Sequence, residues 1–60
     1  MFVELDARQD AGYVISLEWD RETDKTQIVV TDGRTANLLV FLAPGPKAGD
    51  AFRHPFRYAP

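Results

Sequence analysis

The side chains best suited to acid–base or phosphate chemistry lie near the end of the chain. His54 is the only histidine, with Arg53 beside it and Arg57 three residues further on. An imidazole between two guanidinium groups could contact a phosphate, but general acid–base catalysis also needs a positioned partner with a matched pKa. The sequence indicates no such carboxylate. The structural alternative is that His54, next to Pro55 at a helix end, caps the last carbonyls or is solvated. We therefore expect no catalytic residue and no enzyme activity.

The same segment alternates cations with aromatic rings. Aromatic rings can stack on the bases of single-stranded nucleic acid while cations follow the phosphate backbone. The alternative is that the rings belong to the core and the arginines surround the sheet edge. The residues in question, which could contact a partner, are Phe52, Arg53, His54, Phe56, Arg57 and Tyr58, with Lys47 before them. Nucleic-acid binding stays the second hypothesis, because residues 1–43 carry four basic and eight acidic side chains.

Acidic residues alternate at Asp20, Glu22 and Asp24, as they do at the start of a calcium-binding loop. An EF-hand needs glycine at its sixth position and glutamate at its twelfth. Lys25 and Thr31 occupy these positions, so the pattern favours a solvated turn. The chain has no cysteine, which excludes a cysteine-based zinc site. We expect no metal site and no cofactor.

Two further groups of residues could form a ligand site. Tyr13 and Trp19 could line a groove, but they alternate with polar residues along a strand, which favours a place in the core. Gly45 and Gly49 do not form a phosphate loop, because the following Lys-Ser/Thr pair is missing.

The pattern of apolar residues predicts the elements that position these groups. It indicates a mainly β fold with minor α: one domain with a four-stranded antiparallel meander, then a one-turn helix and an extended tail. The expected strands are residues 2–8, 13–19, 26–31 and 37–42, and the expected helix is residues 50–54. Residues 43–49 contain two prolines and are expected to be a linker that is neither helix nor inner strand. Asp50 is expected to be the N-cap.

Alternation sets the expected register of the first two hairpins. Leu5 should lie opposite Ile15, and Val3 opposite Leu17, so that both apolar faces coincide. In the second hairpin, an Asp20–Lys25 pair closes a four-residue loop. That pairing places Leu17 opposite Ile28 and Ile15 opposite Val30.

The third hairpin contains an Asp-Gly turn signal, but a two-residue loop would place Thr35 opposite Val30. We therefore expect a longer loop, about residues 32–37, with an odd number of residues. Such a loop pairs Val30 with Ala36 or Leu38. Asn37 is then expected to take the left-handed conformation, which asparagine tolerates.

This register gives the sheet two apolar faces. The larger face is predicted to carry Val3, Leu5, Ala7, Tyr13, Ile15, Leu17, Trp19, Ile28, Val30, Leu38, Val40 and Leu42. The second face, predicted as the interaction surface, carries Phe2, Val14, Val29, Leu39 and Phe41. The C-terminal rings can cover part of one face but not both, and a single sheet cannot bury two faces alone.

A second copy of the chain is the simplest partner, because two-fold homodimers are the commonest soluble oligomers. A different protein, or a sheet curled around its own tail, is the alternative. The sequence thus predicts a non-enzymatic module for protein–protein contact that acts as a homodimer or higher homo-oligomer.

The segment from Trp19 to Tyr58 resembles a group of short bacterial proteins of unknown function. The shared features are an Asp-x-Arg-Thr turn at Asp32, Arg34 and Thr35, and a tail with an aromatic His-Pro-aromatic pattern around His54. The resemblance implies a β-meander and brings no activity with it. Acidic and basic residues interrupt the N-terminus, and no apolar run approaches the ~20 residues of a membrane helix. We expect a cytoplasmic protein with no membrane partner.

Overall fold

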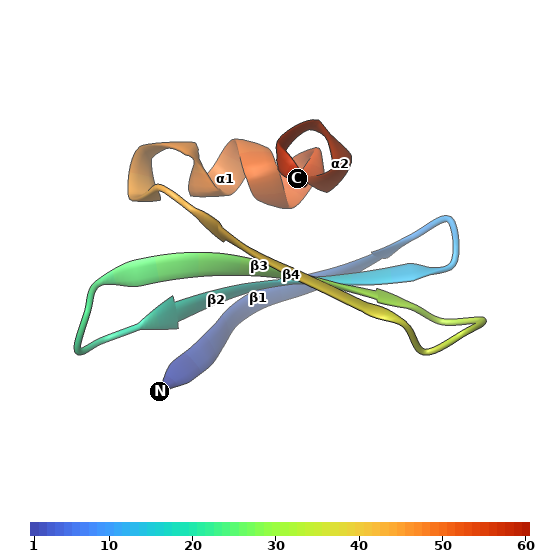
Figure 1. Cartoon of the computed structure of the whole chain (residues 1–60), viewed down its shortest axis with the longest axis horizontal. Coiled ribbons are helices and arrows are strands. Elements are labelled where there is room, and N and C mark those ends of the chain that lie inside the picture. Colours follow the sequence, from blue (N-terminus) through green and yellow to red (C-terminus); the bar gives the residue numbers. More distant parts are fainter.

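A computed structural model describes all 60 residues and shows a four-stranded antiparallel sheet with two helices over one face (Figure 1). Each strand pairs with the next along the chain, in the order β1-β2-β3-β4. The fold class predicted from the sequence is confirmed. The elements are β1 Phe2–Asp10, β2 Tyr13–Asp20, β3 Lys25–Asp32, β4 Leu38–Ala43, α1 Gly45–Arg53 and α2 Pro55–Tyr58.

A two-residue turn joins β1 to β2. Asp10 pairs with Tyr13, and the two residues between them, Ala11 and Gly12, have φ of 51° and 86°. Positive φ at both central positions is the requirement of the type I′ turn, whose twist matches that of antiparallel strands. Glycine meets this requirement without strain, whereas Ala11 pays a steric penalty for it.

A β-bulge at Leu5 interrupts β1. The pairing runs Val3 with Trp19, then shifts between Glu4 and Asp6, so that Arg8 lies opposite Ile15. The predicted pairs Leu5–Ile15 and Val3–Leu17 are therefore wrong. One extra residue moves the following side chains to the other face. Arg8 consequently points toward the helices, and Ala7 lies on the other face of the sheet.

The β2–β3 hairpin has the predicted register. Asp20 pairs with Lys25 across a four-residue turn, Leu17 pairs with Ile28, and Ile15 pairs with Val30. The observed parity places Ile15 and Leu17 of β2 on the same face as Ile28 and Val30 of β3, which is the arrangement that buries the most apolar surface.

The loop of the β3–β4 hairpin lies where it was predicted, but it has four residues rather than an odd number, and this gives the hairpin the opposite parity. Val30 pairs with Leu39 and Ile28 with Phe41, not with Leu38 and Val40. The loop closes with a hydrogen bond from Asp32 N–H to the Asn37 carbonyl, at 2.9 Å. Ala36, with φ of 62°, takes the left-handed conformation predicted for Asn37.

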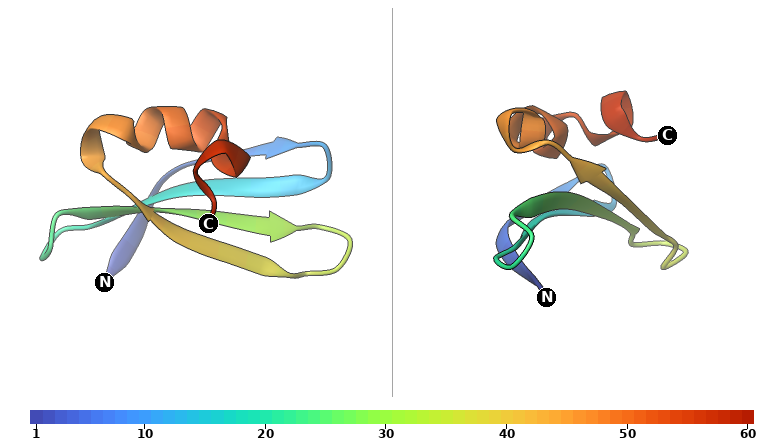
Figure 2. Two further views of the ribbon diagram at one scale, coloured as in Figure 1. Left: turned by 45° about the horizontal axis from the view of Figure 1, so that its top comes forward. Right: turned by 60° about the vertical axis from the view of Figure 1, so that its left-hand side comes forward.

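The core lies between the sheet and the helices. Its buried members are Ile15, Ile28, Val30, Phe41, Ala43 and Ala51. Figure 2 shows both helices on the same side of the twisted sheet. We call this side the covered face and the other side the open face. α1 packs mainly on β3 through its small residues Ala48 and Ala51, which let the helix approach the strands.

The helical region begins earlier than predicted. Pro44 is the N-cap of α1 and Pro46 lies in its first turn, where a missing backbone N–H has no helical partner to lose. Residues 45–49 are therefore helix and not linker, and Asp50 lies inside α1 and is not its N-cap. Pro55 ends α1 as predicted and begins α2, so the tail is helical rather than extended. Neither helix has the length and apolar content needed to cross a membrane.

Candidate functional site

An aliphatic stripe on the open face holds three of the five exposed large hydrophobic residues of the sheet; the other two, Val3 and Leu5, lie on β1. The stripe consists of Leu38, Val40 and Leu42, which are 63%, 47% and 58% exposed. These three residues alternate along β4 and therefore point to the same side. A stripe of this kind, bordered by polar residues, is typical of a contact surface. We call it the β4 stripe.

The remainder of the open face is more polar toward β1. The Gln27 side-chain amide donates to Glu18 at 2.7 Å, and the Ser16 hydroxyl donates to Glu4 at 3.3 Å. Val29, which is half-buried, lies between Ser16 and Val40, whereas Val14, also half-buried, lies on β2 opposite Thr31. The apolar part of this face therefore lies at the β3–β4 side of the sheet.

The predicted interaction set does not form one surface. Phe2, Val14 and Val29 lie on the open face, but the pairs Val30–Leu39 and Ile28–Phe41 place Leu39 and Phe41 on the covered face. Phe41 is only 8% exposed and belongs to the core. The predicted register of the third hairpin had the wrong parity. It therefore assigned these two residues to the wrong face of the sheet and assigned the β4 stripe to the core.

The outer backbone edge of β4 is unpaired, because β4 is the last strand of the sheet. In an antiparallel pair, the residues alternate between those that bond across the pair and those whose N–H and C=O point away. Asp32 bonds to Asn37, so Leu39 and Phe41 bond to β3. The backbone groups of Leu38, Val40 and Leu42 then point outward from the sheet.

The other sheet edge, β1, is protected. It contains the bulge at Leu5, and the Ala7 N–H is bonded to the Asp6 carboxylate at 2.8 Å. It also carries four charged side chains, Glu4, Asp6, Arg8 and Asp10. Bulges and charges are the usual devices that prevent edge pairing. β4 has neither: its sequence is Leu-Leu-Val-Phe-Leu-Ala.

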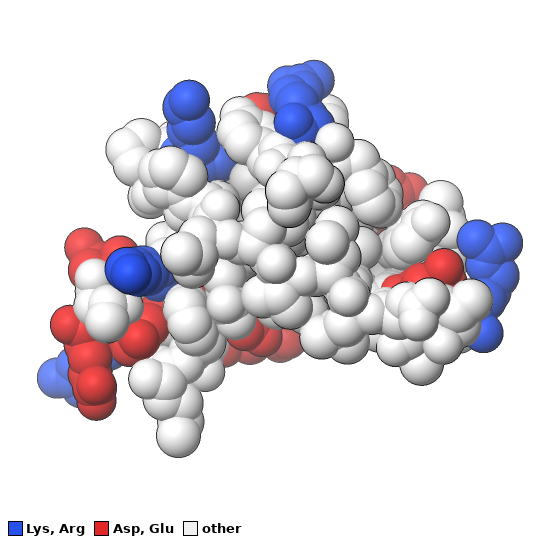
Figure 3. Space-filling view, viewed as in Figure 1, with Lys and Arg blue, Asp and Glu red and all other residues white.

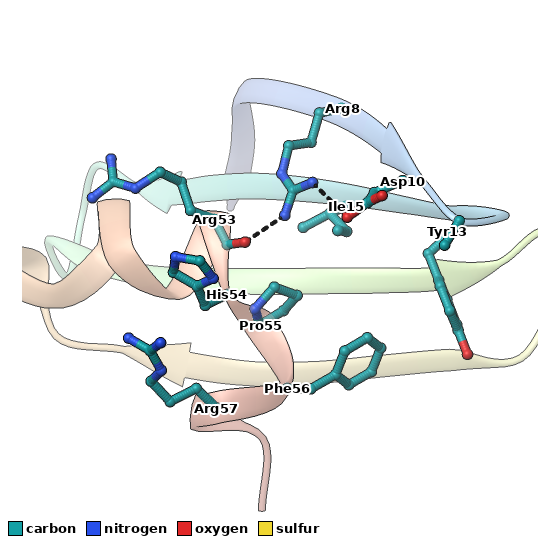
Figure 4. Close-up of a pocket in the computed structure, with 10 residues that line it drawn as sticks. Arg8, Asp10, Tyr13, Ile15, Arg53, His54, Pro55, Phe56 and Arg57 are labelled. Atoms are coloured by element: carbon teal, nitrogen blue, oxygen red, sulfur yellow. Dashed lines mark hydrogen bonds and ion pairs between the residues drawn. The ribbon is translucent and has the colours of Figure 1, made fainter.

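A pocket of about 400 Å³ lies where β1 and β2 meet the break between the two helices (Figure 4). The rings of Tyr13 and Phe56 form one wall, in an edge-to-face arrangement with centroids 5.3 Å apart. Its lining includes Arg8, Arg53, His54 and Arg57. In Figure 4, the Arg53 and Arg57 guanidinium groups extend away from the two rings, on the far side of His54.

The side chain of Arg8 has a structural role. Its Nε and Nη2 donate to the Phe52 carbonyl at 3.2 and 3.0 Å, Nη2 also donates to the Arg53 carbonyl at 2.7 Å, and Nη1 reaches Asp10 at 3.4 Å. The guanidinium lies 5.6 Å from the centroid of the Phe52 ring. Arg8 thus caps the C-terminal carbonyls of α1, the role considered for His54 from the sequence. This contact joins two residues that are 44 positions apart in the chain, and it depends on the bulge in β1. No sequence pattern indicates it.

The six predicted tail residues are close in sequence but have different environments. Phe52 and Tyr58 pack partly buried against the core, and only the Phe56 ring is exposed, at 58%. His54 is exposed at the helix break, and its side chain makes no hydrogen bond. A capping histidine or a catalytic histidine with a paired carboxylate would each need such a bond. The tail therefore offers one free ring rather than a stacking platform.

Asp50 connects the two helices. Its carboxylate accepts a hydrogen bond from the Tyr58 hydroxyl at 2.5 Å and lies 3.4 Å from Arg57 Nη1. The Tyr58 hydrogen bond lowers the pKa of Asp50 below the usual value, with help from the Arg57 charge. The same bond to a carboxylate raises the pKa of Tyr58. This pair fixes α2 against α1 rather than presenting a reactive group.

The acidic residues of the β2–β3 turn are engaged in the turn itself. Asp20 accepts hydrogen bonds from the Glu22 N–H and the Thr23 hydroxyl, each at 3.0 Å, and the first of these lowers the pKa of Asp20. Asp24 accepts the Trp19 indole N–H at 2.8 Å. Figure 3 shows several acidic side chains gathered at this end of the molecule, with others below the centre and toward the opposite end. The carboxylates stabilise a turn and do not converge on one point.

No protein-family model matches this chain, and neither the curated proteins nor the solved structures contain a match to it.

Proposed function

We propose that this chain is a non-enzymatic protein-interaction module that works as a homo-oligomer in the cytoplasm, in an accessory or regulatory role. The observation that carries the proposal is the β4 stripe. Three large aliphatic side chains, each about half exposed or more, stand in a row beside an unpaired strand edge.

The size of the chain adds a thermodynamic reason. A 60-residue domain buries only about 60% of the surface that its unfolded chain exposes, so its stability alone is marginal. The chain has no disulfide. Oligomerisation is a common remaining device in so small a domain. Burying the β4 stripe against a second copy would remove its aliphatic surface from water and stabilise both chains.

The experiment is light scattering behind size exclusion over a concentration series. The wild type is expected to reach the mass of a dimer or a larger assembly. Leu42→Lys, in the β4 stripe, should shift the chain to monomer. The matched control is Gln27→Lys, opposite Leu42 on the same face but outside the stripe, and it should associate like the wild type. A monomer at every concentration would contradict the proposal.

Nucleic-acid binding is the second candidate, and one observation favours it. Arg53, His54 and Arg57 are among the residues that line the same pocket as the exposed Phe56 ring. A labelled single-stranded oligonucleotide at low salt tests it, because phosphate contacts weaken steeply as salt rises. Binding that is lost in Arg53→Gln and retained in Arg34→Gln would support this candidate, and no retardation of the oligonucleotide would remove it.

A further inference from the structure

We infer that the second copy binds at the edge of β4: two β4 strands pair antiparallel about a two-fold axis at Val40 and join two sheets into one of eight strands. This inference rests on the proposed self-association and specifies its geometry. It differs from packing one open face on another, in which the backbone edge of β4 would take no part.

The hydrogen-bonding groups have the correct spacing for this pairing. The outward N–H and C=O groups belong to Leu38, Val40 and Leu42, the alternate residues of the strand. A two-fold axis at Val40 places Val40 opposite its own copy and Leu38 opposite Leu42 of the second copy. In all three pairs, the outward N–H and C=O groups of one strand face those of the other strand, so the two residues of each pair can exchange hydrogen bonds.

The side chains are self-complementary about the same axis. On the open face, the opposed pairs are Leu38 with Leu42 and Val40 with Val40. On the covered face, Leu39 lies opposite Phe41. Every cross-strand pair is apolar, and no charged residue lies between Leu38 and Ala43. Figure 3 shows the same feature as an uncharged area in the centre of the view, where β4 is nearest the viewer.

The charges beyond the two ends of β4 do not oppose the pairing. At one end, Asp24 and Lys25 of the β2–β3 turn lie beside Leu42 and Pro44, and their opposite charges balance each other. At the other end, Arg34 is 76% exposed and lies 3.7 Å from Asp32, which offsets its charge. Antiparallel pairing places these two nearly neutral ends next to each other.

The backbone is free to pair on this side alone. β1, the opposite edge, has a bulge and an N–H already bonded to Asp6. The choice of one edge gives a closed dimer, whereas pairing at both edges would give an open filament. A pairing of five residues is small among protein interfaces, so the dimer should dissociate on dilution.

Single cysteines test the register, because the chain has none of its own. Leu38→Cys and Leu42→Cys are each prepared and oxidised alone, and then as a mixture. Directly opposed residues in a bonded pair have Cα atoms about 5.5 Å apart, within the range of a disulfide. The mixture should form disulfide dimers about tenfold faster than either variant alone, because two residues in identical positions lie about 14 Å apart along the strands.

Val40→Pro provides a second test. Proline removes an N–H that points away from β3, so no bond within the sheet is lost, and proline is tolerated at such edge positions. The variant should keep its β-sheet circular dichroism and become monomeric. Gln9→Pro is the matched control on the β1 edge: Gln9 also points outward there, next to the bonded Asp10–Tyr13 pair, and this variant should keep the wild-type mass.

The outcomes separate the inference from the proposed function. If the wild type associates but the cysteine mixture oxidises no faster than its components, the edge geometry is wrong and self-association stands. If the wild type is monomeric at every concentration, both fail. If Val40→Pro does not fold, the cysteine mixture alone decides.

Discussion

The guanidinium of Arg8 holds the carbonyl oxygen of Phe52 with two N–H groups, at 3.2 and 3.0 Å. This contact joins the first strand to the last turn of α1, where carbonyl groups lack helical partners and a cation is favourable. It depends on the bulge at Leu5, because without the extra residue Arg8 would point to the open face. The helices are thus fixed to the sheet from its far edge.

Replacing Arg8 should therefore loosen the helices. Arg8→Ala is expected to lower the free energy of unfolding by about 1.5–3 kcal/mol, the range for hydrogen bonds to charged groups. Arg8→Lys should lose part of this, since an ammonium group cannot donate in a fork. Urea unfolding measures the change. Arg34→Ala, at a 76% exposed side chain, is the control and should change stability by less than about 0.5 kcal/mol; equal losses in Arg8→Ala and Arg34→Ala would contradict the capping role.

The ends of two turns touch at Gly33. Its N–H donates to the Gly12 carbonyl at 2.9 Å, and a Cβ at residue 33 would lie 2.9 Å from that same oxygen. Gly33→Ala should force the turns apart and lower the melting temperature, whereas Gly45→Ala, where no atom lies within 4 Å, should not. A melting temperature of Gly33→Ala equal to that of Gly45→Ala would show that the contact is unimportant.

The first turn can be improved. Ala11 has φ of 51° in a type I′ position, where alanine pays a penalty of about 1–2 kcal/mol and asparagine is tolerated. Ala11→Asn creates the preferred Asn-Gly pair and should raise the free energy of unfolding by about 0.5–1 kcal/mol. Ala7→Asn, in the exposed part of β1, is the control that should give no gain. A decrease in stability for Ala11→Asn would contradict the assigned turn.

The Asp50–Tyr58 pair should give stability a dependence on pH. The pKa of Asp50 is lowered by the Tyr58 hydrogen bond, so its contribution is present above the usual aspartate value of 3.8 and is lost as the pH falls through the lower pKa of the folded state. The pKa of Tyr58 is raised, so its contribution is present below pH 10.0 and is lost as the pH rises through the higher pKa of the folded state.

Tyr58→Phe tests this assignment. It should lower the melting temperature at neutral pH and flatten both limbs of the profile, and the NMR titration of Asp50 should return toward its usual pKa. Tyr13→Phe is a matched control, since the Tyr13 hydroxyl makes no hydrogen bond within the chain. If the profiles of wild type and Tyr58→Phe coincide, the pair does not stabilise the helices.

The fold could be predicted as far as alternation was informative. β2 alternates from Ile15 to Asp20, and its register with β3 was correct to the residue. β4 is apolar at every position from Leu38 to Leu42, so alternation could not choose between its faces. A loop with an even number of residues was rejected because the two-residue version gave poor pairs, but the observed loop is even as well, with four residues. The β4 stripe was consequently assigned to the core.

Two further errors have physical causes that a pattern does not show. A bulge adds one residue without changing the composition of a strand, and β1 looks regular because Val3, Leu5 and Ala7 alternate. The prolines at residues 44 and 46 were interpreted as helix breakers, although the first helical turn accepts proline. The candidate site could be predicted only in kind, as an unpartnered apolar surface, because its location depends on the parity of the last hairpin.

Self-association of this chain is tested by its mass in solution, measured by light scattering over a concentration series. The mass should be that of a dimer at high concentration and should fall toward that of the monomer on dilution. A monomer mass at every concentration would contradict self-association, and the β4 stripe would then have to be explained by a different protein.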